Sequence, residues 1–312
     1  MKLFKKILCP LDFSEASHEA FDYAKMFAEA FDAQLILLHV CPSMTEAYSA
    51  LMPDFPDFGV QKPEDVLEEL NSFSGDWRGV YKKEIKAGSP YLEILRYAEK
   101  EKVDLIIQGA KGLSKIERLF LGSTGEKVTR KSVCPVLTVH SRGSMAIKKV
   151  LVPIDFSPLS YTVVPTVAAL AERFQAEIHL LHVVEFGYRV DRRGQEMESK
   201  YFEQVKERLA NQWEIPDEFN KILTKKFVRH HVGSAGYGIR DFAQDWDIDL
   251  IAMATHGRTG VSKVLMGSVT EKVIKIAPCP VLSIRSQPGG ESWQVCKHLG
   301  ERRTRSNWVN IF

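Results

Sequence analysis

Runs of consecutive apolar residues alternate with amphipathic segments along most of the chain. The run Leu35–Leu38 contains no polar residue, which is typical of a strand in a parallel sheet that is covered on both faces. Other segments repeat apolar residues at the helical spacing i, i+3, i+4 and i+7, as in Ile239, Phe242, Ala243 and Trp246. This alternation of strands and helices predicts right-handed crossovers and therefore a doubly wound α/β fold.

The pattern occurs twice, which indicates a tandem duplication. Three pairs of segments show it: KILCPLDFSEAS (6–17) and KVLVPIDFSPLS (149–160), DLIIQGAKG (104–112) and DLIAMATHG (249–257), and LGSTGEKV (121–128) and MGSVTEKV (266–273). We therefore predict two domains, 1–140 and 147–286, followed by a mobile tail over 287–312. Each domain is expected to hold a five-stranded parallel sheet in the order 3-2-1-4-5, flanked by helices.

Five strands are predicted in each copy from the positions of the apolar runs. They lie near 5–11, 34–40, 80–87, 103–109 and 135–140, and near 148–154, 177–183, 225–232, 248–254 and 280–285. One segment falls outside the pattern, because residues 41–63 contain four prolines and several aromatic residues. Proline is poorly tolerated inside helices, so this segment is predicted to be a structured loop.

Composition and charge narrow the range of functions. A net charge of +2 over 312 residues gives no electrostatic basis for nucleic-acid binding, and no apolar run is long enough to span a membrane. The five cysteines form no close pairs, which fits a reducing cytoplasm better than a disulfide framework. His230 and His231 are adjacent and would point to opposite faces of a strand, so no metal site is predicted.

The glycine spacing G-x2-G-x9-G suggests where a ligand binds. Gly109 ends the fourth predicted strand, Gly112 lies in the following loop, and Gly122 and Ser123 precede a predicted helix. Glycine lets a ligand approach the backbone closely, and the amide groups at a helix start favour phosphate. In doubly wound sheets ligands bind beyond the carboxyl ends of the strands. The alternative is that these glycines only form tight turns and that Ser123 only caps the helix.

A carboxylate follows the first strand of each copy. Asp12 and Asp155 are each followed by phenylalanine and serine, and Ser14 and Ser157 are predicted N-caps. At the carboxyl end of a strand, such a carboxylate can accept hydrogen bonds from an exocyclic amine or a ribose hydroxyl. The alternative is a carboxylate that only supports the turn.

Other chemistries have weaker support. Cys9 and Cys134 are candidate redox thiols, but Cys134 and Cys279 open matching strands, which favours buried packing residues. His39 and His182 end the second strands, where packing is favoured over catalysis. The sequence contains no P-loop and no nucleophile-elbow motif, and no catalytic residue is assigned.

These motifs resemble those of the universal stress protein family, over about residues 1–140 and 147–286. The resemblance implies bound ATP, alone or with Mg²⁺. The implied ligand-binding residues are Pro10, Asp12, Val40, Gly109, Lys111, Gly112, Gly122, Ser123 and Thr124, and in the second copy Pro153, Asp155, Val183, Ala254, His256, Gly257, Gly267, Ser268 and Val269. The second copy departs from the motif, since Ala254 replaces the first glycine and His256 stands where the first copy has Lys111.

The resulting hypothesis is a cytoplasmic stress-response protein that binds ATP as a conformational ligand. Its alternatives are a scaffold of the same fold without nucleotide, and a slow ATPase or nucleotide-dependent transferase. The resemblance also implies pairing of the two domains through their last strands, as an intramolecular pseudo-dimer, with a further homodimer as a possible assembly. Two features favour ATP binding first to residues 1–140. Ala254 is strained if this position needs a positive φ, and Lys111 carries a permanent charge where the second copy has His256, which is mostly neutral at pH 7.

Overall fold

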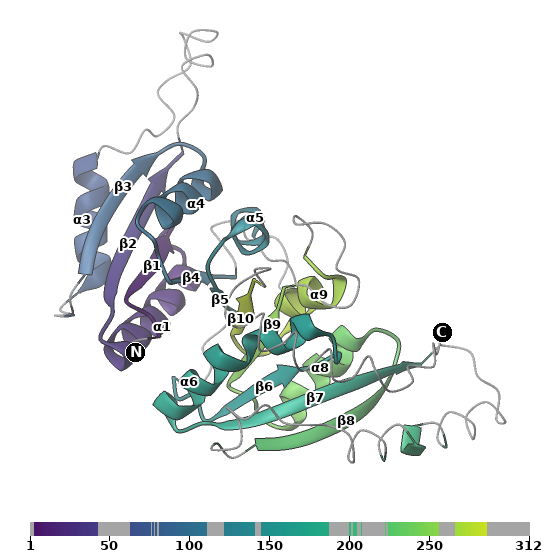
Figure 1. Cartoon of the computed structure of the whole chain (residues 1–312). Helices are drawn as coiled ribbons and strands as arrows, with labels where there is room; N and C mark the ends of the chain where they lie inside the picture. The colour runs from purple at the N-terminus through teal and green to yellow at the C-terminus, as the bar shows by residue number, and fades with distance from the viewer. Residues whose placement is uncertain are drawn as a thin grey trace, which may run out of the picture. The chain divides into compact units, whose positions relative to one another are not determined.

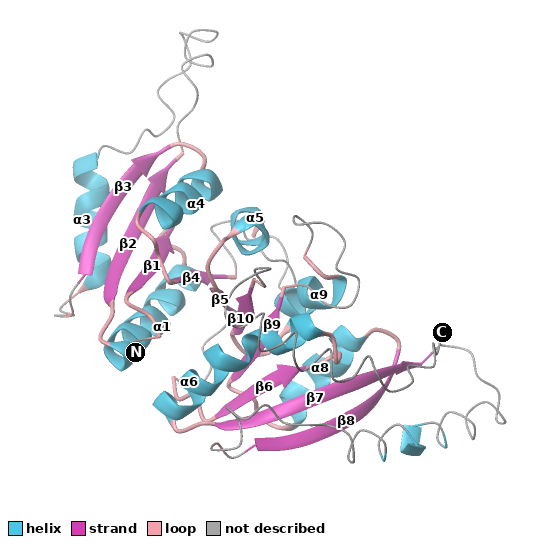
Figure 2. Cartoon of the chain, in the orientation of Figure 1, coloured by secondary structure: helices cyan, strands magenta, loops and turns pink. Residues whose placement is uncertain are grey.

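The computed structural model describes residues 3–42, 63–75, 77, 79, 81–110, 122–140, 145–186, 200, 202–204, 207, 222, 224–255 and 266–285. The chain divides into two compact units, Met1–Met145 and Ala146–Phe312. Each unit is a parallel sheet with helices on both faces (Figures 1 and 2). Residues 43–62 of the predicted loop and the whole predicted tail, 287–312, lie outside the described residues.

The first unit has the predicted strand order, β3-β2-β1-β4-β5, with every neighbouring pair parallel. Its elements are β1 (Lys6–Leu11), α1 (Glu15–Phe31), β2 (Gln34–Cys41), α3 (Pro63–Ser74), β3 (Tyr81–Ala87), α4 (Pro90–Lys100), β4 (Leu105–Gly109), α5 (Ser123–Lys131) and β5 (Val136–Val139). All five strands lie where the apolar runs predicted them. Their central members are buried on both faces, which explains why these runs lack polar alternation.

The second unit repeats this topology as β8-β7-β6-β9-β10, again with parallel pairs. Its elements are β6 (Lys149–Pro153), the 3₁₀-helix η1 (Pro158–Val163), α6 (Val164–Phe174), β7 (Glu177–Phe186), β8 (Thr224–Val232), α8 (Ala235–Asp245), β9 (Leu250–Ala254), α9 (Ser268–Ile276) and β10 (Val281–Ile284). The main difference from the first unit follows β6, where a 3₁₀-helix replaces the first turns of α1.

The predicted N-caps of the first helices are confirmed. The hydroxyl of Ser14 accepts a hydrogen bond from the amide of Ser17, and the hydroxyl of Ser157 accepts one from the amide of Ser160. Each serine therefore satisfies an amide that the helix start leaves without a backbone partner. The caps also place α1 and η1 directly after the turns that contain Asp12 and Asp155, at the carboxyl ends of β1 and β6.

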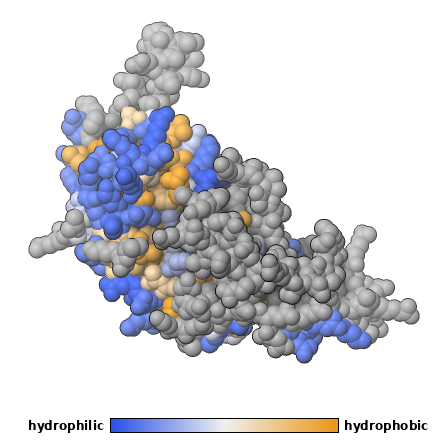
Figure 3. All heavy atoms as spheres, in the orientation of Figure 1, coloured by the Kyte–Doolittle hydropathy of each residue, from blue (hydrophilic) through white to orange (hydrophobic). Residues whose placement is uncertain are grey.

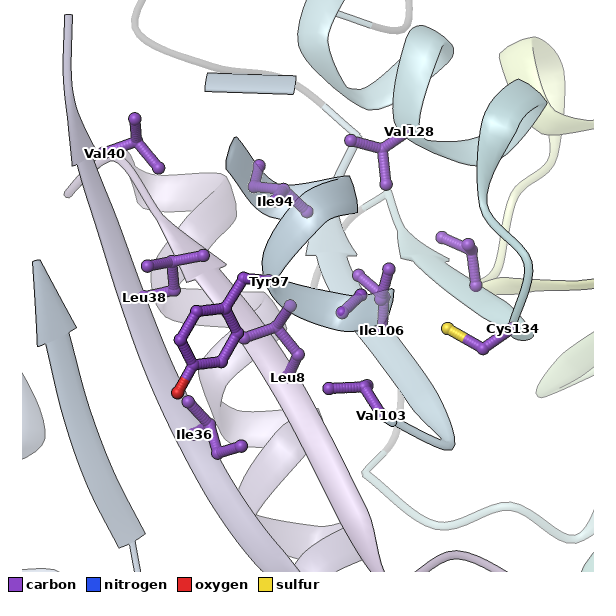
Figure 4. Close-up of a cluster of buried hydrophobic side chains, with 12 residues drawn as sticks. Leu8, Ile36, Leu38, Val40, Ile94, Tyr97, Val103, Ile106, Val128 and Cys134 are labelled. Atoms are coloured by element: carbon purple, nitrogen blue, oxygen red, sulfur yellow. The ribbon is translucent and has the colours of Figure 1, made fainter. Parts of the chain in front are cut away.

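The core of the first unit lies on both faces of its sheet, and Figure 4 shows the part beneath α4 and α5. Strand residues pack here against the helices through alternate side chains; the members are Leu8, Ile36, Leu38, Val40, Ile94, Tyr97, Ala98, Val103, Ile106, Val128, Cys134 and Val136. The outer surface differs in character, since the visible face of this unit in Figure 3 is mainly hydrophilic with smaller hydrophobic areas. None of the described helices is long and apolar enough to cross a membrane.

The helical face predicted in the second copy is confirmed, although its last residue is only partly buried. Ile239, Phe242 and Ala243 are buried in α8, whereas Trp246 is 41% exposed. The helix ends at Asp245, and Trp246 stacks on Phe242 with 5.5 Å between the ring centroids. Like Phe242, Trp246 also contacts the rings of Phe227 and His179, so it stays on this face.

Candidate ligand-binding site

The candidate site of each unit lies where the direction of the crossovers reverses. β1 pairs with β2 on one side and with β4 on the other, and β6 pairs likewise with β7 and β9. In parallel sheets, the two loops that leave such neighbouring strands at their carboxyl ends diverge and leave room for a ligand. Asp12 follows β1 and Gly109 ends β4, so the two predicted parts of the first site share one edge of the sheet.

The aspartate supports its turn in both units. Oδ1 of Asp12 accepts hydrogen bonds from the amide and the hydroxyl of Ser14, at 3.1 Å and 2.5 Å. Oδ1 of Asp155 accepts the corresponding bonds from Ser157, at 2.9 Å and 2.6 Å. The turn-supporting alternative is therefore correct for this oxygen. Both aspartates remain partly exposed, so a support role and a ligand role are compatible.

Gly109 is needed for close packing rather than for an unusual backbone angle. Its φ lies outside the left-handed region, so the condition for strain at Ala254 is not met. A Cβ atom on Gly109 would instead lie 2.6 Å from the carbonyl oxygen of Ala16 at the start of α1. In the second unit, the matching helix start is the 3₁₀-helix η1, and alanine occupies the glycine position.

The two helix starts that face this edge carry no side-chain cap. α5 begins after Gly122 and α9 begins after Gly267, and neither helix has a side-chain hydrogen bond at its N-cap. Among the described residues, nothing accepts a hydrogen bond from the amides of Ser123 and Thr124. The alternative in which Ser123 caps the helix is therefore wrong, because Ser123 is the first helical residue and is exposed.

A backbone hydrogen bond joins each helix start to the preceding strand. The amide of Gly122 donates to the carbonyl of Ala110 at 2.8 Å, and that of Gly267 donates to Thr255 at 2.8 Å. In both units a backbone hydrogen bond thus holds the N-cap glycine beside the residue that follows the strand. Lys111 and Gly112, like His256 and Gly257 in the second copy, lie outside the described residues.

The remaining predicted residues lie in the strands that border the site. Pro10 pairs in register with Leu38, and Pro153 pairs with Leu181. Val40 is only 7% exposed and belongs to the core cluster beneath α4, where Figure 4 shows it beside Ile94. Val183 is less buried, and the glycine-rich start of α8 approaches it closely: a Cβ atom on Gly238 would lie 2.8 Å from its Cγ1.

Charge near the helix starts is balanced in the same way in both units. Glu126 lies in the first turn of α5 and forms an ion pair with Arg130 at 2.7 Å. Glu271 in the first turn of α9 pairs with Lys275 at 2.6 Å. A carboxylate near a helix start would oppose the binding of an anion, and each ion pair offsets that charge.

The candidate redox thiols are packing residues. Burial raises the pKa of Cys9 and of Cys134 above the ordinary range, and it raises the pKa of Cys279 to about 12. A thiol in this state is protonated at neutral pH and is a poor nucleophile. The described residues contain no group of three or more His, Cys, Asp or Glu side chains arranged to hold a metal ion.

Sequence reasoning missed a contact beside each aspartate, between the phenylalanine that follows it and a histidine of the second strand. Phe13 and Phe156 follow the aspartates with φ of 60° and 62°, and their rings contact His39 and His182. The recurrence of D-F-S and L-L-H-V in both copies was the signal that could have found them.

These observations define a class of protein: two doubly wound α/β domains, each with a carboxylate and a glycine-preceded helix start at the switch point of a parallel sheet. The model of the universal stress protein family matches residues 3–140 and 146–285. The chain therefore belongs to the universal stress protein family and carries two copies of its domain.

Individual relatives resemble either one domain or both. The chain is 31% identical over 163 residues to universal stress protein MJ0577 of Methanocaldococcus jannaschii, which covers 46% of this chain and 98% of that protein. It is 25% identical over 293 residues to a universal stress protein of Mycolicibacterium smegmatis, covering 89% and 96%. A universal stress protein from Archaeoglobus fulgidus has a similar fold, with a TM-score of 0.63, 22% identity, and coverage of 92% and 100%.

Proposed function

We propose that each domain binds an adenine nucleotide, ATP, at the carboxyl edge of its sheet, and that the protein acts in the stress response as a nucleotide-dependent regulator. One observation carries the proposal. In both units, a helix start and a carboxylate lie at the same edge of the sheet. The glycine before the helix donates a hydrogen bond to the residue that follows the neighbouring strand.

The proposed roles follow from the chemistry of these groups. The free amides at the start of α5, with the hydroxyls of Ser123 and Thr124, are suited to phosphate oxygens. Asp12 is suited to accept hydrogen bonds from the adenine amine or a ribose hydroxyl, since its carboxylate is partly exposed. Mg²⁺ would supply charge neutralisation between phosphate oxygens when it is bound. In the second domain Asp155, Ser268 and the amide of Val269 take the corresponding roles.

The first prediction tests this site with a matched pair of variants. Gly122→Val and Gly267→Val each place a branched side chain at one helix start, and neither glycine has a φ that valine cannot adopt, −59° and −62°. Each variant should lose one of two ATP-binding events in calorimetric titrations of the full chain, because the side chain covers the amides of that helix start only. Thermal unfolding of the same samples shows whether the fold is kept.

The outcomes separate the alternatives left open by the sequence. Two binding events in the wild type, one in each variant and none in the double variant support nucleotide binding in both domains. Unchanged titrations in both variants would remove the helix starts from the site. A wild type that binds no adenine nucleotide would leave a scaffold of the same fold.

A further inference from the structure

The phenylalanine after each aspartate has an unusual backbone conformation. Phe13 has φ of 60° and Phe156 has φ of 62°, which is rare for a bulky side chain. The other non-glycine residues with positive φ in the described part of the chain lie within two residues after a helix, where this conformation is common; they are Asp32, Lys102, Gln175 and Asp247. Helix termination therefore explains those four residues and does not explain the two phenylalanines.

In the first domain, the strained conformation places Phe13 against His39. The two rings stack with 4.6 Å between their centroids and 22° between their planes. Nδ1 of His39 lies 2.9 Å from the carbonyl oxygen of Leu11, the residue directly before Asp12. Because a carbonyl oxygen only accepts hydrogen bonds, Nδ1 carries the proton. The histidine thus holds the chain on one side of Asp12, and Ser14 binds its carboxylate on the other.

The second domain repeats this arrangement with different neighbours along the chain. The rings of Phe156 and His182 are 4.6 Å apart, and Nδ1 of His182 lies 2.7 Å from the carbonyl oxygen of Ile154. Ile154 directly precedes Asp155. The first helix differs between the copies, α1 in one and η1 in the other, yet the hydrogen bond and the ring contact recur. The ring planes of Phe156 and His182 are 50° apart, so this pair is tilted where the first pair is stacked.

Among the described residues, the ring of His39 makes no polar contact other than the one to Leu11. Its side chain is 6% exposed, and Nε2 is buried with no hydrogen-bond partner. Phe73 of α3 packs against the edge of Phe13 at 5.8 Å and stacks on His18 at 3.9 Å, so the phenylalanine is held from its outer side as well. The only hydrogen bond of the ring within this part of the chain is the one to Leu11.

We propose that Phe13 with His39, and Phe156 with His182, are positioning residues that orient the aspartate carboxylates for the ligand. The proposal rests on the proposed function for the identity of that ligand, an adenine nucleotide. The histidine fixes the carbonyl before the aspartate, and the phenylalanine packs on the histidine and forces the turn in which serine binds the carboxylate. Asp12 and Asp155 are thereby preorganised, which lowers the cost of ordering them when the ligand binds.

The test compares two substitutions of one histidine in the full-length chain. His39→Leu removes the hydrogen bond to Leu11, whereas His39→Asn keeps a donor near the position of Nδ1. The first readout is hydrogen exchange at the amide of Ser14, which donates to Asp12 at 3.1 Å and needs no nucleotide. The second readout is the affinity of the first site for ATP. His182→Leu is the matched control, with the amide of Ser157 as its reporter.

His39→Leu should speed exchange at Ser14 about tenfold and weaken ATP at the first site about tenfold, as expected for the loss of one buried hydrogen bond. His39→Asn should restore most of both, and His182→Leu should affect only Ser157 and the second site. Amides of β5 report whether the fold is kept. Phe13→Gly is the second variant: glycine adopts this φ without strain but loses the ring contacts with His39 and Phe73, so it should also loosen Ser14.

Unchanged exchange at Ser14 and unchanged ATP affinity in His39→Leu would overturn the proposal, as would equal losses in His39→Leu and His39→Asn. A different result separates the two proposals. If the wild type binds no ATP while His39→Leu still loosens Ser14, the nucleotide function is wrong and the positioning of Asp12 stands.

Discussion

A single methyl group distinguishes the strand ends of the two sites. Gly109 leaves room for the carbonyl of Ala16, whereas Ala254 occupies the equivalent position beside a 3₁₀-helix. The difference therefore reflects how closely the first helix approaches the sheet. It does not involve backbone strain at this position. Residue identity at this position is coupled to the type of helix that follows the aspartate.

Gly109→Ala should destabilise the first domain by about 1–3 kcal/mol, because the new Cβ overlaps backbone atoms that cannot move without shifting α1. The reverse change, Ala254→Gly, should cost less than about 1 kcal/mol, since it only removes a methyl group from a strand. Hydrogen exchange of β4 and β9 amides measures both effects within the full chain. Equal costs at the two positions would contradict the packing explanation.

At the scale of elements, β7, β8 and α8 meet around one buried histidine. The side chain of His179 is inaccessible to solvent and stacks on Phe227 at 5.0 Å. Phe242 and Trp246 contact its ring from α8. Burial lowers the pKa of His179 below its ordinary range, although the carboxylate of Glu177, which is bonded to Nε2, acts in the opposite direction. Folding therefore favours the neutral form of the imidazole ring.

This histidine should make the second domain less stable as the pH falls. The unfolded chain binds the proton near pH 6.5, and the folded chain binds it only at lower pH. Stability should therefore be complete above about pH 6.5 and decrease below it, by about 1.4 kcal/mol for each unit of pKa difference. Urea titrations of wild type and His179→Phe between about pH 7.5 and 5.5 measure this loss.

The difference between the two proteins isolates His179 from the other histidines. The pKa of Glu177 is lowered by Lys225 and His179 against the effect of its own burial, so this carboxylate stays ionised throughout that range. Parallel pH dependence in wild type and His179→Phe would show that another group is responsible.

At the scale of the whole molecule, the two edges of the first sheet differ in their protection. β3 carries Lys82, Lys83, Glu84 and Lys86, and charges on an edge strand oppose pairing with another chain. β5 reads VLTV, contains no charge, and is buried along its length. The edge strand β5 therefore suits the pairing of two domains, which we expect within one chain.

Residues 1–143 expressed alone should form dimers or larger assemblies through β5, because the fragment keeps this uncharged edge and lacks the second domain. Analytical ultracentrifugation of the fragment and of the full chain over the same concentration range provides the comparison. A fragment that stays folded and monomeric at high concentration would argue against an interface at β5.

Much of the architecture follows from local pattern. Apolar runs placed the strands that are buried on both faces, and the duplicated motifs identified the two helix starts at the sheet edge. These features depend on neighbours along the chain, since burial of a strand on both faces demands uninterrupted apolar residues and a helix start near a strand end demands glycine at the turn.

The sequence by itself thus determined the class of fold and its duplication, and it predicted the edge of the sheet where we propose that a ligand binds. Tertiary structure alone decided why Gly109 must be glycine, how Phe13 is turned, and which atom His39 holds. The partners in these contacts are far apart in sequence, as with His39 and Leu11, 28 residues apart. Periodicity records only which face a residue occupies, and contact between distant residues depends on how whole elements pack.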